Sequence, residues 1–392
     1  MNYHVFIVNN TTFQYHLRYG FAGTGAGNRE VSFLSKPETS FNYAVETNFV
    51  KMIADISRIR AGDKILFYLC ATPTTQGAFY GVFKASSSAF FDESNANNYL
   101  RHELGKPLAF RVRIEPDTVF PYGVSEHLYL DSLDQITHPH EMCWSMIYRK
   151  LKGNRGCTMI TEYEFERLLN QLKQVNDNSY SNTIQSFDFN QKERKIEPSE
   201  SPEAYGGATD PLDIKKRLLI KANRTQKFEA HFQAYIMQNY DLSPLRELLL
   251  PLPDESCWIG NEVSCGIGMQ KIDILILQKI KNEIYIKLVE LKCVQPDDYI
   301  LERQLPWYIQ WLSDYVVPNY TSKNLTVHLI PCVIALGENK AFADKCKAFK
   351  TTLAKENKNL ILEPAEYISF SYNKTEIVFK KESGSAPNEK QS

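Results

Sequence analysis

Three charged side chains interrupt two apolar stretches of the sequence between residues 271 and 292. The segment KIDILILQKIKNEIYIKLVELK predicts two strands joined by a polar turn, and it contains Asp273, Glu290 and Lys292. Alternate residues of a strand share a face, so Glu290 and Lys292 point the same way. In a folded hairpin the start of the first strand meets the end of the second. The three charges are therefore predicted to cluster at one rim of a sheet.

Two neighbouring carboxylates in an apolar setting suit a hard divalent cation. A buried ion is costly unless it is paired or metal-bound, and close carboxylates repel each other. Mg²⁺ prefers oxygen ligands and commonly binds one or two carboxylates together with a substrate phosphate. Asp273 and Glu290 are therefore candidate magnesium ligands, with Mn²⁺ as a substitute. Lys292 could orient the attacking water or stabilise charge while a phosphodiester is cleaved.

An alternative explanation treats this hairpin as a sheet edge with solvated charges. Charged side chains are common on edge strands, where they discourage pairing with other chains. A solvated edge would not need Ile, Leu and Val on both faces, and this favours a buried functional site. Glu262, in the preceding strand, is left open as an additional ligand or a surface residue.

Bulk composition limits the class of protein. The 392 residues are enough for two ordinary domains, and 43% hydrophobic with 23% charged residues is typical of a folded chain. A net charge of −1 argues against a uniformly basic nucleic-acid binder but permits local basic patches. Eight scattered cysteines without a CxxC pair argue against a secreted disulfide framework. Without a signal pattern or an apolar run of about 18 residues, we expect a cytoplasmic protein that does not span a membrane.

Changes in composition divide the chain into three parts and a tail. Residues 1–175 are mostly strand-like and close on an amphipathic helix. Residues 176–212 are polar and rich in Ser, Asn, Pro and Gly, which predicts a flexible linker. Helices and strands follow over residues 213–381, and this predicts a second domain. Residues 382–392 are predicted to be a disordered tail.

The motifs of this second domain resemble the PD-(D/E)XK nucleases. Asp273 followed by Glu290-Leu291-Lys292 resembles the family motif, and FEAHFQAYIMQN and ERQLPWYIQWLSDYV resemble the flanking helices of NucS-like members. The likeness covers about residues 228–337, although the proline that often precedes the motif aspartate is missing. It implies an α/β restriction-endonuclease-like domain with a central mixed sheet flanked by helices. The implied catalytic residues are Asp273, Glu290, Lys292, Glu229 and Gln304, with Tyr308 nearby, and the implied metal ligands are Asp273, Glu290 and Leu291.

The strands of the first domain resemble the small β-barrels of the EVE, YTH and PUA group. GDKILFYL, GAFYGVFKA and LAFRVRI carry this likeness, which covers roughly the first 170 residues. It implies an α+β domain built on a barrel, in a group that binds RNA or extruded, often modified, DNA bases. Reading an extruded base requires stacking faces and a few polar groups. The candidate pocket walls are Tyr68, Tyr80 and Trp144, although aromatic residues in strands more often belong to the core.

One basic stretch of the first domain could contact phosphates. YRKLKGNRG, residues 148–156, holds four cations within nine positions: Arg149, Lys150, Lys152 and Arg155. Such side chains typically position a protein on a nucleic-acid backbone. The alternative is a solvated loop before a helix.

Two further motifs lack the residues that their chemistry would need. GFAGTGAGN has closely spaced glycines but not the phosphate-loop pattern, so we expect a flexible loop that lines a pocket. HPHEMC offers His138, His140 and Cys143, but a structural zinc site needs a fourth ligand and usually paired spacing. We therefore expect neither a nucleotide loop nor a zinc site.

Together these patterns predict a base-reading domain joined to a Mg²⁺-dependent restriction-type endonuclease that acts on DNA, with modified DNA among its candidate targets. One alternative is an RNA-directed or DNA-repair nuclease. Another is a non-catalytic nucleic-acid-binding protein with a decayed nuclease domain, although the intact Asp273, Glu290 and Lys292 argue against decay. Cutting both strands requires two active sites or sequential nicking, so we expect a homodimer.

Overall fold

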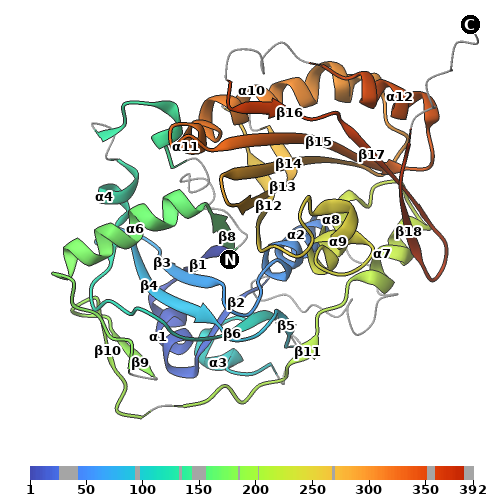
Figure 1. The fold of residues 1–392 in the computed structure, drawn as a ribbon. Coiled ribbons are helices and arrows are strands. Elements are labelled where there is room, and N and C mark those ends of the chain that lie inside the picture. The colour runs from blue at the N-terminus through green and yellow to red at the C-terminus, as the bar shows by residue number, and fades with distance from the viewer. Residues whose placement is uncertain are drawn as a thin grey trace, which may run out of the picture. The chain divides into compact units, whose positions relative to one another are not determined.

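The computed structural model of the chain divides into two compact units (Figure 1). Unit 1 contains Met1–Thr137 and Cys143–Arg217, and unit 2 contains His138–Met142 and Leu218–Ser392. The boundary after Arg217 lies close to the predicted start of the second domain. The described residues are 1–25, 43–92, 98–131, 135–143, 156–183, 186–201, 203–266, 270–350 and 358–383.

Unit 1 is built on a curled, nine-stranded mixed sheet (Figure 1). Its strands follow the order β11 (Asp210–Pro211), β5 (Phe90–Phe91), β6 (Phe110–Pro116), β4 (Ala78–Ala85), β3 (Lys64–Leu69), β1 (Tyr3–Val8) and β8 (Cys157–Ile160). Two more strands pair outside this order, β2 (Phe21–Thr24) with β6 and β7 (Val124–Ser125) with β4. Strands β1 and β3 are parallel, whereas β3, β4 and β6 are antiparallel neighbours. The prediction of an α+β domain is confirmed at the level of a curled mixed sheet with helices.

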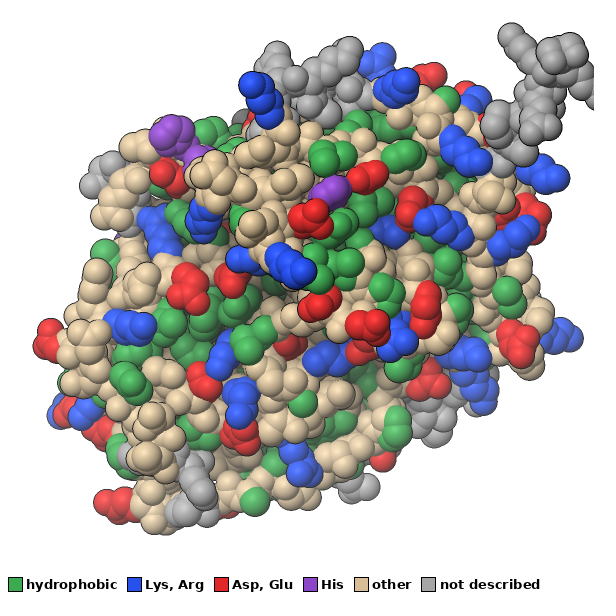
Figure 2. Space-filling model, in the orientation of Figure 1, with side chains coloured by type: hydrophobic (Ala, Val, Ile, Leu, Met, Phe, Trp, Pro, Cys, Tyr) green, Lys and Arg blue, Asp and Glu red, His purple; other side chains and the backbone are tan. Residues whose placement is uncertain are grey.

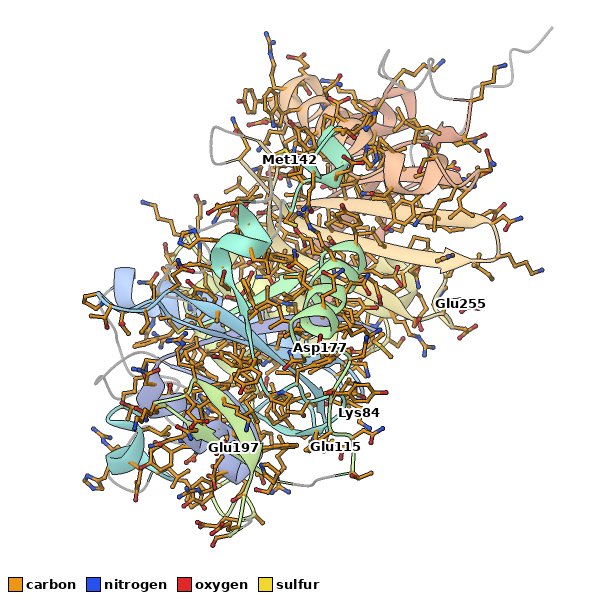
Figure 3. All side chains as sticks on the ribbon, turned by 90° about the vertical axis from the view of Figure 1, so that its left-hand side faces the viewer. Lys84, Glu115, Met142, Asp177, Glu197 and Glu255 are labelled. Carbon is orange, nitrogen blue, oxygen red and sulfur yellow. The ribbon has the colours of Figure 1, made fainter. Side chains whose placement is uncertain are left out.

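The register of β4 and β6 places side chains of opposite charge next to each other. Lys84 on β4 lies opposite Glu115 on β6, and their side chains form an ion pair of 2.6 Å (Figure 3).

The helices of unit 1 are α1 (Asn10–Tyr19), α2 (Tyr43–Ser57), α3 (Arg101–Leu104), α4 (Glu126–Leu130) and α6 (Glu162–Val175). Helix α1 begins at a capping box formed by Asn9 and Thr12 and ends at Gly20, whose φ of +61° suits glycine.

The predicted flexible linker contains ordered structure. Strands β9 (Phe187–Asn190) and β10 (Lys195–Pro198) form a hairpin. The Phe189 ring packs 4.8 Å from Phe13 of α1, and further along the segment the Tyr205 ring packs 5.4 Å from Phe21. A few alternating apolar residues therefore attach this polar segment to unit 1, and its average composition did not reveal them.

Unit 2 contains a seven-stranded mixed sheet. The order is β12 (Cys257–Ser264), β13 (Lys271–Ile280), β14 (Glu283–Lys292), β15 (Thr326–Leu336), β17 (Glu366–Tyr372) and β18 (Ile377–Lys381), with β16 (Leu360–Leu362) beside β15. Strands β12, β13 and β14 are antiparallel, and β15 is parallel to both β14 and β17. Lys281, with a φ of +50°, makes the turn of the β13–β14 hairpin. The predicted hairpin and the predicted mixed sheet are both confirmed.

Helices lie on both sides of this second sheet. Figure 1 shows α10 and α12 along one side and α8 and α9 along the other. The helical elements are η2 (Pro139–Glu141), α7 (Lys215–Ala222), α8 (Glu229–Asn239), α9 (Leu245–Leu249), η3 (Ile300–Gln304), α10 (Leu305–Tyr315), α11 (Pro318–Thr321) and α12 (Lys340–Ala348). Pro306 is the second residue of α10, which follows the π-helical turn η3 without a break, and that wider turn accommodates its missing N–H.

Several expectations about the whole chain can be compared with the structure. All eight cysteines are free thiols. Within the described parts of the chain, no helix is long and apolar enough to cross a bilayer. On the face drawn in Figure 2, acidic and basic side chains are interspersed, in keeping with a net charge near zero. Residues 384–392 of the predicted tail lie outside the described residues.

Candidate active site

Strand β13 loses its regular pairing at Asp273. The β13–β14 ladder begins at Ile274, which lies opposite Val289, and Asp273 precedes it. On the other side, the β12–β13 ladder omits the position at which Glu262 would face Asp273. Glu262 has a φ of +46°, in the left-handed region that few residues other than glycine adopt. Both ladders are interrupted at Asp273, so its main-chain oxygen and its carboxylate have partners other than the regular ladder bonds.

Side chains from two helices bond to the start of β13. Gln233 of α8 donates from Nε2 to the main-chain oxygen of Asp273 over 3.0 Å. The Tyr308 hydroxyl of α10 lies 3.0 Å from the main-chain oxygen of Lys271. Residues 271 and 273 alternate along the strand, so these two carbonyls leave it on the same edge. The two helices thus supply the partners that a neighbouring strand would otherwise supply.

The Asp273 carboxylate accepts a main-chain hydrogen bond from β14. The N–H of Leu291 donates to Asp273 Oδ2 over 2.8 Å. This bond links the two strands where the regular ladder has ended. Because Leu291 stands between Glu290 and Lys292, it holds the Asp273 carboxylate against the Glu-x-Lys part of the motif.

Glu290 is the most heavily bonded side chain of the cluster. It is buried, and its Oε1 lies 2.5 Å from Lys292 Nζ and accepts a 3.0 Å hydrogen bond from Gln304 Nε2. The Tyr308 hydroxyl lies 3.2 Å from its other oxygen. The structure therefore brings together Asp273, Glu290, Lys292, Gln304 and Tyr308, as the sequence predicts.

The cluster carries an excess of negative charge. Burial, followed by the charges of Glu290 and Glu229, raises the pKa of Asp273 well above its ordinary value, against the opposing effects of the Leu291 N–H and Lys292. Burial lowers the pKa of Lys292, but the neighbouring carboxylates, Glu290 first, raise it by more. Lys292 therefore stays protonated as the cation among three carboxylates.

This donor set fits a hard divalent cation that keeps part of its water shell. Among the described residues, no group of three or more His, Cys, Asp or Glu side chains is placed to hold a metal ion. Mg²⁺ does not require such a cage, because it is usually bound through one or two carboxylates, waters and a substrate phosphate. Asp273 is half-buried as a residue, beside the exposed Glu229.

Glu229 and Glu262 have different relations to this cluster. Glu229 is exposed in the first turn of α8, and its charge raises the pKa values of both Asp273 and Lys292. Glu262 is buried, and its Oε2 lies 2.9 Å from Lys271 Nζ. Glu262 is therefore not a surface residue, and its role as an additional ligand stays a prediction.

Gln233 was not predicted from the sequence. A single glutamine carries no signal of its own, because its side chain is neutral and common in helices. Its spacing from Glu229 is i, i+4, which puts both on one face of α8. That spacing, combined with the prediction for Glu229, could have identified it.

The tyrosines predicted as base-pocket walls belong to the core of unit 1. Tyr68 and Tyr80 have relative exposures of 1% and 2%. The Tyr68 hydroxyl donates to Glu126, and the Tyr80 hydroxyl donates to the main-chain oxygen of Arg194. They lie on opposite faces of the sheet, Tyr68 packed against Phe79 and Tyr80 against Phe13 and Phe189. Both are enclosed by the core and do not line an accessible pocket, so this prediction needs correction. The remaining predicted contacts, Trp144, Arg149, Lys150, Lys152 and Arg155, lie outside the described residues.

The histidine- and cysteine-containing motif does not form a metal site among the described residues. His138 and His140 belong to unit 2, whereas Cys143 belongs to unit 1. His138 Nδ1 lies 3.8 Å from Glu141, and Cys143 lies 3.8 Å from an Arg167 nitrogen.

Comparisons with known proteins give limited information. No protein-family model and no curated protein matches the chain. A hypothetical protein from Leishmania major matches 45% of this chain and 96% of its own, at 13% identity and a TM-score of 0.27. A protein from Pseudomonas putida matches 43% of this chain and 99% of its own, at 15% sequence identity and a TM-score of 0.27. Human THYN1, solved in complex with 5-methylcytosine-containing DNA, matches 44% of this chain and 98% of its own, at 9% sequence identity and a TM-score of 0.25. These identities and TM-scores establish neither fold nor function here.

Proposed function

We propose that unit 2 is a Mg²⁺-dependent endonuclease domain of the PD-(D/E)XK type, acting on DNA. The observation that supports this most strongly is the placement of Asp273. Its carboxylate lies where β13 leaves β14, is held by the Leu291 N–H, and neighbours the Glu290–Lys292 ion pair. A carboxyl group with a raised pKa beside a second carboxylate and a protonated lysine is typical of a catalytic site.

The proposed ligands of the magnesium ion are the carboxylates of Asp273 and Glu290 and the main-chain oxygen of Leu291. When bound, Mg²⁺ would lower the pKa of a bound water and neutralise charge on the phosphate. Lys292 has the role of orienting the attacking water and stabilising negative charge that develops on the phosphate. Gln304 and Tyr308 hold Glu290 in place through their hydrogen bonds. The exposed carboxylate of Glu229 adds to the field that attracts a cation.

We further infer that unit 1 supplies the specificity of a restriction-type enzyme by reading a base, modified DNA being one candidate. Support comes from the likeness of the strand segments at residues 62–69, 77–85 and 108–114 to the EVE, YTH and PUA group, and from the curled mixed sheet that they form. Tyr68 and Tyr80 have no part in this proposal, because they are core residues. A homodimer would provide the two active sites for a double-strand cut.

A substrate panel tests the proposed function. The full chain is incubated with unmodified DNA, base-modified DNA and RNA, each with Mg²⁺, with Mn²⁺ and with a chelator. We expect metal-dependent cleavage of DNA. Cleavage of RNA alone would favour the RNA-directed alternative. Binding without cleavage of any substrate would favour the non-catalytic alternative, and a light-scattering mass of one chain with and without DNA would contradict the homodimer.

A further inference from the structure

Three adjacent faces of the helical stretch at 298–308 have different surroundings. Residues four apart lie near one face both in an α-helix and in the wider π-helical turn at Ile300–Gln304. One face carries Gln304 and Tyr308, whose polar atoms bond to Glu290. A second face carries Asp298, Glu302 and Pro306, which line an open groove with Lys345. The face between them presents Tyr299, Arg303 and Trp307, all exposed.

The Trp307 ring is exposed although it is fixed in place. Its relative exposure is 48%, yet its Nε1 donates to the main-chain oxygen of Cys265 over 2.9 Å. The ring also lies against Gly266, where an added Cβ would come within 3.0 Å of ring atom Cζ2. Tyr299, eight residues earlier, is 61% exposed. A rigid, half-exposed indole is pre-organised for stacking, because little side-chain freedom remains to be lost on binding.

This exposed face borders the candidate active site. Trp307 immediately precedes Tyr308, which contacts Glu290. Burial raises the pKa of the Cys265 thiol to about 12, and the charges of Glu290 and Asp273 contribute to the shift, so Cys265 lies within their field. Cys265, which anchors the Trp307 ring, also donates its N–H to the main-chain oxygen of Gln270, the neighbour of Lys271, whose own main-chain oxygen the Tyr308 hydroxyl contacts.

We propose that Tyr299, Arg303 and Trp307 form a platform on which unpaired bases of the nucleic-acid strand stack as the strand enters the active site. This proposal rests on the proposed nuclease function and narrows its substrate to DNA with unpaired or extruded bases near the cut. In a duplex, neighbouring pairs cover both faces of each base, whereas an unpaired base can stack on an aromatic ring regardless of sequence. Arg303, between the two rings in the stripe, can contact a phosphate or stack on a base.

The charged side chains of the neighbouring face repel a nucleic-acid strand only weakly. Asp298 forms an ion pair of 2.6 Å with Lys345, which offsets its negative charge. Glu302 remains on that face, while the exposed Arg303 provides a positive charge within the stripe itself. Stacking itself depends on ring contact more than on net charge, and therefore tolerates a mixed surface.

Binding measurements without metal test the platform separately from catalysis. A labelled single-stranded oligonucleotide and a blunt duplex of the same sequence are titrated with the full chain and with Trp307→Ala, Trp307→Phe and Val378→Ala. Val378 is an exposed apolar residue of β18, at the far end of the sheet order from β12. We expect Trp307→Ala to weaken single-strand binding about tenfold and duplex binding much less, because one stacking contact is lost. Trp307→Phe and Val378→Ala should bind both as the wild type does.

Two results would overturn the platform. One is unchanged single-strand binding by Trp307→Ala, and the other is an equal loss for single strand and duplex. Should Trp307→Ala fail to fold, Tyr299→Ala takes its place, because Tyr299 is more exposed. Metal-dependent cleavage is measured in a separate assay. If the protein binds single strands through Trp307 but cleaves no substrate, this result contradicts only the nuclease proposal.

Discussion

The side-chain amide of Gln233 and the main-chain oxygen of Asp273 form a 3.0 Å hydrogen bond that ties α8 to the start of β13. Gln233 is buried, so water does not compete for this carbonyl. The bond forms where neither neighbouring strand pairs regularly with Asp273. Helix α8 therefore determines where β13 lies at this point, and with it where the Asp273 carboxylate points.

Replacing Gln233 with Leu should impair cleavage beyond its effect on folding. The variant keeps the side-chain volume but leaves the Asp273 carbonyl without its donor, which costs about 1–2 kcal/mol of stability. We expect kcat to fall about tenfold with little change in KM, because Asp273 loses its alignment rather than its contact with substrate. Steady-state kinetics and denaturant unfolding measure the two effects.

The matched control is Gln278→Leu. Gln278 is also buried on β13, and it bonds to the main chain of Leu252 and Glu255 at the other end of the strand. This variant should lose stability but keep the kcat of its folded fraction. Equal losses of kcat in both variants would contradict a positioning role for Gln233.

Replacing Tyr308 with Phe should weaken the use of metal. The hydroxyl contacts both Glu290 and the main chain of Lys271, so its removal loosens the carboxylate and β13 together. We expect the Mg²⁺ concentration for half-maximal cleavage to rise about tenfold, the lower end of what lost contacts around metal ligands typically cost. Tyr285→Phe is the control, because its hydroxyl bonds to Glu283 at the surface. An unchanged metal dependence in Tyr308→Phe would show that Glu290 does not need this hydroxyl.

Strand parity explains why much of the candidate site could be predicted from the sequence. The period of two places Glu290 and Lys292 on one face, and hairpin closure brings Asp273 to them. Sequence could not reveal that pairing would break at Asp273, because the break depends on the backbone of Glu262 and on a hydrogen bond from Gln233. Contacts between elements far apart in the chain have no local signature.

The aromatic residues of unit 1 illustrate the opposite case. Tyr68 and Tyr80 have the ring and hydroxyl that a base pocket needs, but the same features serve a core with internal hydroxyl acceptors. Which role applies depends on what packs over each ring, and here both faces of the sheet are covered. The hairpin at Phe187–Pro198 was missed because its few buried residues stand in a polar segment.

The buried His16 should make the protein less stable in acid. Burial, followed by the charge of Arg111, lowers the pKa of His16 from 6.5 to about 3. As the pH falls below about 6.5, the unfolded chain binds a proton at His16 that the folded chain refuses, so stability is lost down to about pH 3. Between about pH 7 and about pH 4.5, this one residue should lower the free energy of unfolding by about 2.5 kcal/mol.

The His16→Phe variant tests this effect. His16 already packs between Phe21 and Phe67, so another aromatic ring suits the site. Urea unfolding of the full chain at both pH values should show a shallower loss of stability for the variant, while exposed His102→Phe keeps the wild-type slope. Part of the pH dependence of stability should remain in His16→Phe, because burial also lowers the pKa of His4. Identical slopes for His16→Phe and wild type would contradict the assignment.

The most direct test of the account is single-turnover cleavage of DNA by Asp273→Asn in the presence of Mg²⁺, with binding to the same DNA measured in parallel. The exposed Asp314→Asn, on α10, serves as the control. We predict that Asp273→Asn loses at least about a thousandfold in rate, since it removes a metal ligand, while its DNA binding stays within about twofold and the control cuts normally. Cleavage by Asp273→Asn at the wild-type rate would contradict an active site at Asp273, Glu290 and Lys292.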